Sequence, residues 1–184
     1  MNAVVITKEE RNKMAGIGTA RNACKRPEMS RRMSDVFSDS EVDVLGMMGE
    51  CAVAEYLGAS VDYSIHMHGD NGTDLTFKGQ TVSVKYNHRW RGFLMVEERQ
   101  GDDIHSGLVN DLKTDLIVLS HGKCMPPKTC VCRDAGGIVV VLAGWLTRDE
   151  FISTASHRDL GLGGRYIVTC DKLRPMHEIW SISA

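Results

Sequence analysis

Long hydrophobic runs, prolines and paired cysteine motifs are scarce in this chain of 184 residues, and each scarcity excludes a class of protein. The longest apolar stretch, from Ile138 to Leu146, is far shorter than the roughly 20 residues that a membrane-spanning helix needs, so we expect no membrane partner. The first residues show no basic segment followed by an apolar one, and we therefore expect a cytoplasmic protein. There are only four prolines, and the pair Pro126-Pro127 does not mark a boundary between domains.

The six cysteines lack the paired C-x2-C spacing that is typical of zinc sites. Without a secretory signal they are expected to be free thiols rather than disulfides. Cys124, Cys130 and Cys132 lie close together in the sequence with His121 nearby, so a zinc site is an alternative to a plain thiol-containing loop. A structural protein built around such a zinc site is the weakest interpretation of the whole chain.

Positive charge is missing from one long stretch, although the net charge is only -2. Residues 33–77 contain no Lys or Arg and nine acids, whereas residues 8–32 hold eight Lys or Arg against three Glu. A nucleic-acid partner requires a basic patch near the working site rather than an overall basic protein. The basic block at residues 8–32 therefore fits either a nucleic-acid contact or a solvated helix surface.

Length and composition predict one soluble globular domain over residues 1–184, with a helical part at about 1–58 and a sheet core at about 59–184. Capping boxes at Thr7, Ser38 and Thr147 predict helix starts, and Gly58 predicts the end of the second helix. The expected helices therefore cover about residues 8–24, 38–57 and 147–156. Strands are expected at 61–67, 73–77, 81–86, 93–97, 116–120, 138–142 and 166–169. This order of elements predicts an α/β fold with a mixed central sheet.

The stretch GDNGTDLTFKGQTVSVKYN, residues 69–87, predicts a hairpin with Lys78-Gly79 as its two-residue turn. This turn places Asp74 opposite Ser83, with Lys85 diagonal to Asp74 and within its reach. One face of the hairpin carries Leu75, Phe77, Val82 and Val84, and the other carries Asp74, Thr76, Thr81, Ser83 and Lys85. Taken alone, the second face fits a solvated surface with an exposed ion pair.

Glu50 lies on an apolar face of the second predicted helix. The residues three and four positions away are Gly46, Met47, Val53 and Ala54. A carboxylate in such surroundings costs several kcal/mol unless it is paired or holds a metal. Together with Asp74 it could hold Mg²⁺, and Lys85 could stabilise the charge on an attacked phosphate. This set of side chains suits hydrolysis of a nucleic-acid backbone.

These residues resemble the PD-(D/E)XK nuclease superfamily, in the style of small phage-type and restriction-like endonucleases. The matching pieces are Gly49-Glu50-x-Ala52, Gly69-Asp70-x-Gly72-x-Asp74, Val82-x-Val84-Lys85, Thr114-Asp115, Gly144-Trp145-Leu146 and Leu173-Arg174-Pro175-Met176. The resemblance implies a restriction endonuclease-like mixed sheet flanked by helices, and an endonuclease that hydrolyses DNA phosphodiester bonds with Mg²⁺ or Mn²⁺. Such enzymes often act as dimers because two strands need two sites, so a homodimer is possible, and RNA is an alternative substrate.

By position, the resemblance implies Glu50, Asp74 and Lys85 as catalytic residues. It implies Glu50, Asp74 and the backbone carbonyl of Val84 as metal ligands. The chain departs from the family pattern at Ser83, where an Asp or Glu is expected two residues before the lysine.

Three alternatives follow from Ser83. In the first alternative, the missing acid is supplied from elsewhere, with Glu50 as the leading candidate and Asp70 or Glu97 behind it. Alternatively, the serine suffices with one metal and weaker binding. Finally, the site is degenerate, and the protein binds nucleic acid or a protein partner without cleaving.

The segment that follows Lys85 mixes aromatic and basic side chains. Arg89, Trp90 and Arg91 are predicted to bind substrate, the arginines on phosphates and the tryptophan on a base. The alternative is a loop in which Trp90 is partly buried and the arginines lie in water.

Overall fold

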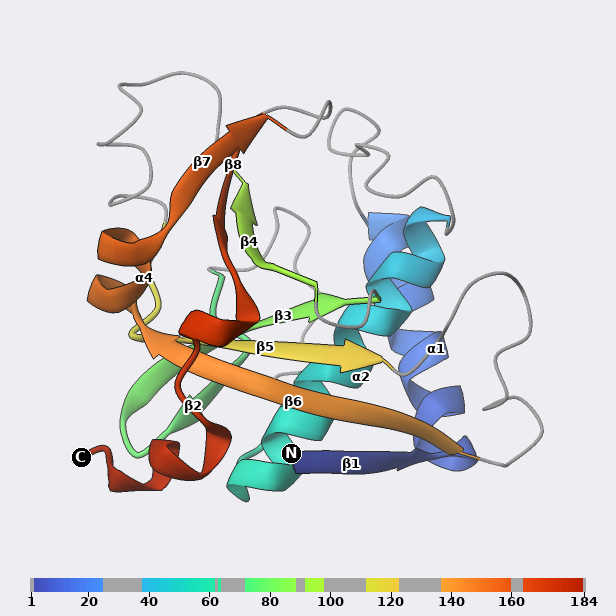
Figure 1. The fold of residues 1–184 in the computed structure, drawn as a ribbon. Coiled ribbons are helices and arrows are strands. Elements are labelled where there is room, and N and C mark those ends of the chain that lie inside the picture. Colours follow the sequence, from blue (N-terminus) through green and yellow to red (C-terminus); the bar gives the residue numbers. More distant parts are fainter. Residues whose placement is uncertain are drawn as a thin grey trace.

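The computed structural model describes residues 2–24, 38–61, 63, 72–88, 92–97, 112–122, 137–159 and 164–183. In these residues the chain forms a five-stranded sheet, a three-stranded sheet and two long helices (Figure 1). The long helices, α1 (Lys8–Cys24) and α2 (Asp39–Leu57), both pack beside the larger sheet.

The larger sheet has the strand order β1-β6-β5-β3-β2. Strands β3 and β5 are parallel, and the other neighbours in this sheet are antiparallel. The prediction of an α/β fold with a mixed central sheet flanked by helices is therefore confirmed. The strands are β1 (Asn2–Thr7), β2 (Leu75–Phe77), β3 (Gln80–Asn87), β5 (Leu116–Gly122) and β6 (Gly137–Thr147).

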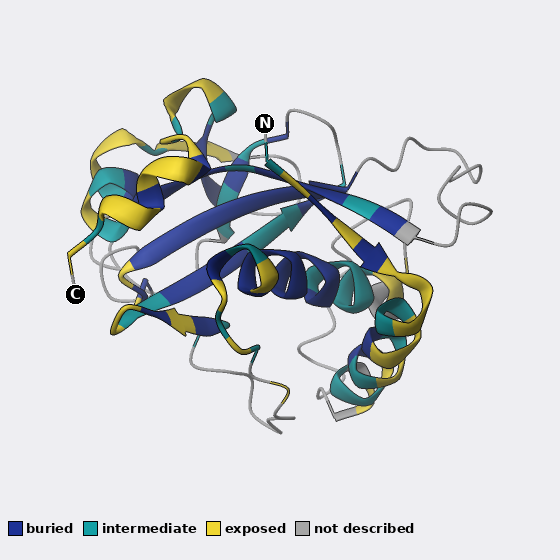
Figure 2. Cartoon of the chain, turned by 90° about the horizontal axis from the view of Figure 1, so that it is seen from below, coloured by how far each residue is buried: buried dark blue, intermediate teal, exposed yellow. Residues whose placement is uncertain are grey.

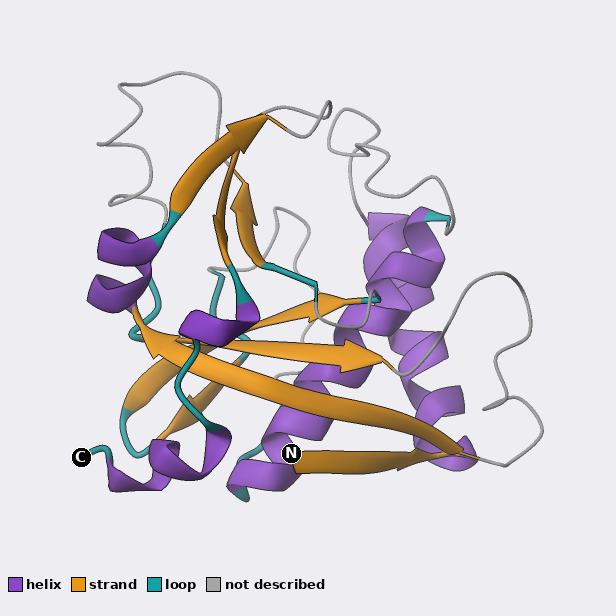
Figure 3. Cartoon of the chain, viewed as in Figure 1, coloured by secondary structure: helices purple, strands orange, loops and turns teal. Residues whose placement is uncertain are grey.

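A second, antiparallel sheet stands off the first one (Figure 3). Its order is β4-β8-β7, with β4 at Leu94–Glu97, β7 at Ser156–Asp159 and β8 at Gly164–Val168. The short helix α4 (Arg148–Thr154) leads from β6 into β7, and the 3-10 helices η3 (Cys170–Lys172) and η4 (Met176–Ser181) follow β8. Neither β7 nor the separation into two sheets was predicted from the sequence.

The predicted helix starts follow from local capping and are confirmed, whereas α4 ends at Thr154, two residues before its predicted end. Ser38 and Glu41 form a reciprocal capping box at the start of α2, and Thr147 and Glu150 do the same for α4. Gly58 ends α2 in the left-handed conformation with φ 63°, which glycine adopts without a Cβ penalty. The helix that carries Glu50 is therefore specified at both ends by its own sequence.

Residues 2–7 correct the predicted boundary between a helical part and a sheet core. They form β1, an edge strand in which Val4 lies opposite Val140, so the sheet already begins before the first helix. No element was predicted there because six residues with two buried positions, Val4 and Ile6, give a weak pattern. Strand β6 is also longer than its predicted range, residues 138–142.

The larger sheet is covered on both faces, which explains why all seven residues of β5 are buried (Figure 2). On one face, α1 and α2 pack on a cluster that includes Val82, Val84 and Val118. On the other face, a second cluster lies under β4, β8 and α4 and includes Ile117 and Leu119. A strand of this sheet therefore sends alternate side chains into two different cores.

The parallel strands β3 and β5 are tied together at their starts by Thr81 and Asp115. The carboxylate of Asp115 accepts hydrogen bonds from the Thr81 backbone N–H at 2.8 Å and the Thr81 hydroxyl at 2.7 Å. In return, the Asp115 N–H donates to the Thr81 hydroxyl at 3.0 Å. These bonds set the register in which β3 presents Ser83, Val84 and Lys85.

Candidate active site beside strand β3

The predicted hairpin register is confirmed. Leu75 lies opposite Val82, and Phe77 lies opposite Gln80. Lys78 and Gly79 have φ angles of 49° and 79°, as a two-residue turn of the primed type requires. The turn thus fixes which residue of β3 meets the start of β2.

Asp74 is the residue just before β2, and it lies beside the part of β3 that extends past the end of β2. Its backbone N–H donates to the Val82 carbonyl at 2.9 Å, and its Oδ2 accepts from the Val84 N–H at 2.5 Å. Because the N–H and C=O of one strand residue point to the same neighbour, the Val84 carbonyl also faces this edge. The structure therefore brings together the Asp74 carboxylate and the Val84 backbone, two of the predicted metal ligands.

Ser83 and Lys85 share a face of β3, as predicted, but that face is not open to water at Ser83. Their partners in β5 are Ile117 and Leu119, which belong to the second core. Ser83 is 3% exposed, so the alternative of a solvated polar face does not hold at this residue. The reason is that β4 and β8 cover this side, which a local pattern does not reveal. Lys85, two residues on, is only half-buried.

Glu50 is buried, at 8% exposure, and forms an ion pair with Arg21 of α1. The Arg21 Nη1 lies 3.3 Å from Oε2 and 3.5 Å from Oε1 of Glu50. The predicted need for a partner is therefore met by an arginine from the N-terminal basic block. Sequence reasoning missed Arg21 in this role, although the charge of the block was the signal that pointed to it.

Gly49 explains how α2 carries Glu50 so close to the sheet. A Cβ at this position would lie 2.6 Å from the Ser120 Oγ and 3.2 Å from the Tyr86 ring. Both distances are shorter than ordinary van der Waals contact, so a larger residue would push the helix away from β3 and β5. The Gly49-Glu50 pair thus combines a close approach with a buried acid.

The segment after α2 connects the surroundings of Glu50 with those of Asp74. Val61 pairs with Leu75, the residue after Asp74. Burial, the hydrogen bond with Cys51 and nearby negative charges that include Glu50 together raise the pKa of Tyr63 to about 12.

A pocket of about 180 Å³ opens beside Lys85. Its described lining includes three basic side chains, Lys85, His88 and Arg165, and no acidic one. Arg165 comes from β8 and is only 7% exposed. Neither His88 nor Arg165 was predicted to belong to the site. Arg165 lies 80 residues from Lys85 along the chain, and only the packing of the second sheet brings the two together.

Several predicted residues lie outside the described residues. They are Asp70, Arg89, Trp90, Arg91, Cys124, Cys130 and Cys132, and the side chain of Glu97. Within the described ranges, no group of three or more His, Cys, Asp or Glu is placed to hold a metal ion. Metal binding at Glu50, Asp74 and Val84 stays a prediction. None of the helices described has both the length and the apolar character needed to span a membrane.

Comparison with known proteins finds no matching family, no matching curated protein and no matching solved structure. The resemblance to the nuclease superfamily therefore depends on the residues and geometry of this chain alone.

Proposed function

We propose that this protein is a metal-dependent nuclease with a restriction endonuclease-like fold that hydrolyses DNA phosphodiester bonds. The observation that supports the proposal best is the contact between the Asp74 carboxylate and the Val84 backbone on the β2 side of β3. Lys85 follows directly on the same strand, as the chemistry requires.

The proposed ligands, two carboxylates and a backbone carbonyl, fit Mg²⁺ or Mn²⁺, because all of their donor atoms are oxygens. Asp74 and the Val84 carbonyl would hold the ion, which when bound would polarise the phosphodiester and lower the pKa of a water. Glu50 is the second acid, and its carboxylate would turn from Arg21 or be shared with it. Lys85 would stabilise the charge that develops on the attacked phosphate.

The basic pocket beside Lys85 supports a polyanionic substrate. Lys85 of β3, His88 just after this strand and Arg165 of β8 line one concavity of about 180 Å³. Phosphate contacts of this kind position a nucleic acid without reading its sequence. Arg89, Trp90 and Arg91 are proposed to extend this surface. The proposed location of such a nuclease is the cytoplasm.

A second candidate function is binding of nucleic acid without cleavage. Two observations favour it: Ser83 is buried where the family pattern has an acid, and Arg21 already neutralises Glu50. A neutral hydroxyl offsets none of the charge of a divalent cation.

The decisive test compares the wild type with Asp74→Asn. Asparagine retains an oxygen that can accept from the Val84 N–H, so the hairpin should fold, but it removes the charge that a cation needs. Supercoiled, linear and single-stranded DNA are incubated with each protein in Mg²⁺, Mn²⁺ or EDTA. Cleavage that requires metal and is lost in Asp74→Asn is the expected result, with the exposed Asp149→Asn as the matched control.

Cleavage by a folded Asp74→Asn at the wild-type rate would remove the basis of the proposal. DNA binding by the wild type with no product under any condition would instead support the second candidate. Circular dichroism of each variant separates loss of chemistry from loss of fold.

A further inference from the structure

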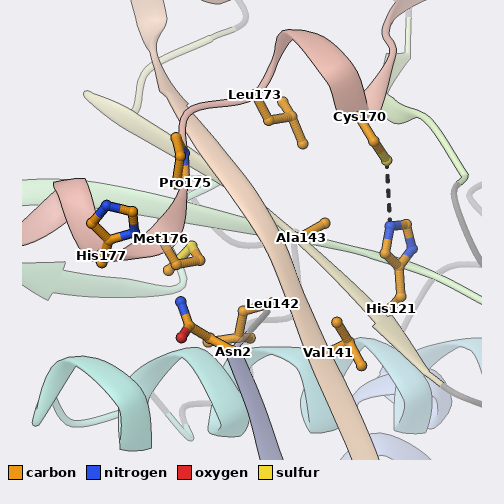
Figure 4. A pocket seen from close by; sticks show the side chains of 10 residues that line it. All are labelled: Asn2, His121, Val141, Leu142, Ala143, Cys170, Leu173, Pro175, Met176 and His177. Carbon is orange, nitrogen blue, oxygen red and sulfur yellow. Dashed lines mark hydrogen bonds between the residues drawn. The ribbon is translucent and has the colours of Figure 1, made fainter.

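A second pocket, of about 450 Å³, lies against β6 and the segment from η3 to η4 (Figure 4). No residue of β2 or β3 lines it, so it is separate from the edge where Asp74 lies. Much of its wall is apolar, contributed by residues such as Val141, Ala143 and Leu173. At one end, however, the side chains of His121 and Cys170 face each other.

The surroundings of His121 favour one tautomer. Its Nδ1 lies 3.4 Å from the Asn87 carbonyl oxygen, and because a carbonyl only accepts, this contact favours a proton on Nδ1. The lone pair is then on Nε2, which lies 3.5 Å from the Cys170 Sγ. Burial lowers the pKa of His121 below its ordinary value, which keeps the ring neutral near pH 7. A metal-binding histidine commonly has this arrangement, with its second nitrogen fixed by a carbonyl.

Cys170 completes a pair of soft donors. Its thiol donates its one proton to the Gly92 carbonyl at 2.9 Å, so it has none left for Nε2. The residue is only half-buried. Zinc binds sulfur at about 2.3 Å and imidazole nitrogen at about 2.0–2.1 Å, so tetrahedral geometry separates the two donors by about 3.5 Å. The Sγ–Nε2 distance of 3.5 Å matches this separation.

We propose that Cys170 and His121 form an open site for a thiophilic transition-metal ion of the Zn²⁺ type. Among the residues that the structure describes, these two side chains supply the ligands, and the remaining positions would be open to the pocket, where water or a small exogenous ligand binds. On binding, the thiol proton passes to solvent, the thiolate forms the bond to the ion, and the hydrogen bond to Gly92 is given up. A hard ion such as Mg²⁺, which prefers oxygen, does not compete here.

The test uses Co²⁺ as a spectroscopic substitute for Zn²⁺, with the full reduced chain. We expect a near-ultraviolet charge-transfer band from a cobalt–thiolate bond that saturates near one equivalent, is displaced by Zn²⁺ and is unaffected by Mg²⁺. Cys170→Ser should abolish it, while retaining a hydroxyl that can donate to Gly92. His121→Gln should weaken binding at least about tenfold. The matched control is Cys51→Ser, because Cys51 is buried and burial raises the pKa of its thiol.

Three results would overturn the proposal. The first is the absence of a band in the wild type, and the second is an undiminished band in Cys170→Ser, which would assign the thiolate to another cysteine. The third is a band of unchanged affinity in a folded His121→Gln. None of these depends on DNA cleavage, so this inference and the proposed nuclease activity succeed or fail independently.

Discussion

The ion pair between Arg21 and Glu50 offers the sharpest test of how the buried acid is held. Replacing Arg21 with methionine keeps most of the length and the apolar stem of the side chain but removes its charge. Glu50 would then keep its own charge at 8% exposure without this arginine. The two side chains are 21% and 11% exposed, so the pair is neither a surface pair nor a fully buried one.

The expected cost lies between two limits. An exposed pair contributes about 0–1 kcal/mol, whereas removal of one partner from a buried pair costs about 3–5 kcal/mol. Because both side chains are mostly buried, we expect Arg21→Met to lower the free energy of unfolding by about 2–3 kcal/mol. For a chain of this length, that lowers Tm by roughly 5–10 °C. The double variant Arg21→Met/Glu50→Gln should lose about 1 kcal/mol or less, since it leaves no charge behind.

Urea denaturation of the wild type, both variants and an exposed control, Lys8→Met, measures these values. An Arg21→Met protein within about 0.5 kcal/mol of the wild type would refute the reasoning, as would a double variant less stable than the single one. The same proteins test the proposed metal role. If Glu50 is a ligand, removing Arg21 should strengthen Mg²⁺ binding, and Mg²⁺ at ten times its Kd should restore about 1.4 kcal/mol.

Three further predictions concern packing and pH. Gly49→Ala should destabilise the protein by about 1–3 kcal/mol, because the added Cβ would contact the sheet. Gly16→Ala, with open space around it, should stabilise the protein by up to about 1 kcal/mol. Equal melting temperatures of the two variants would contradict this. Burial lowers the pKa of His121, so as the pH falls this histidine is protonated in the unfolded chain before it is protonated in the folded one. The free energy of unfolding should therefore decrease as pH drops below about 6.5. In urea titrations, His121→Gln should make this decrease smaller. Hydrogen bonds from the Thr81 side chain and backbone lower the pKa of Asp115, so the contribution of Asp115 to stability should be complete above about pH 4 and fade in acid. Asp115→Asn should lower the free energy of unfolding by about 1 kcal/mol at pH 7. An unchanged midpoint of urea denaturation would count against the tie between β3 and β5.

The sequence was sufficient wherever local chemistry decides the structure. The capping boxes at Ser38 and Thr147 and the turn at Lys78-Gly79 are each encoded within a few residues, and all have the predicted form. The placement of Asp74 beside Val84 follows from the turn as well, because a two-residue turn sets the register of the hairpin.

The remaining features depend on partners that are distant in the sequence. Nothing near Glu50 in the sequence reveals that Arg21 will meet it, and nothing near Lys85 points to Arg165. Ser83 is buried only because a second sheet packs on its face, and an alternating pattern cannot distinguish a solvated polar face from a covered one. The short strand β1 gave too few alternating positions to be predicted.

The pairing of β1 with β6 also has a consequence for the time course of folding. Val4 finds its partner in Val140, so β1 has no neighbour in the larger sheet until a strand more than 130 residues further along the chain has been made. The hairpin that carries Asp74 needs only residues a few positions apart and is free to form much earlier. Closure of so long a loop is slow, and it leaves the apolar face of α2 without its full cover in the meantime. The nascent chain therefore completes its candidate catalytic edge before it completes the sheet that supports it.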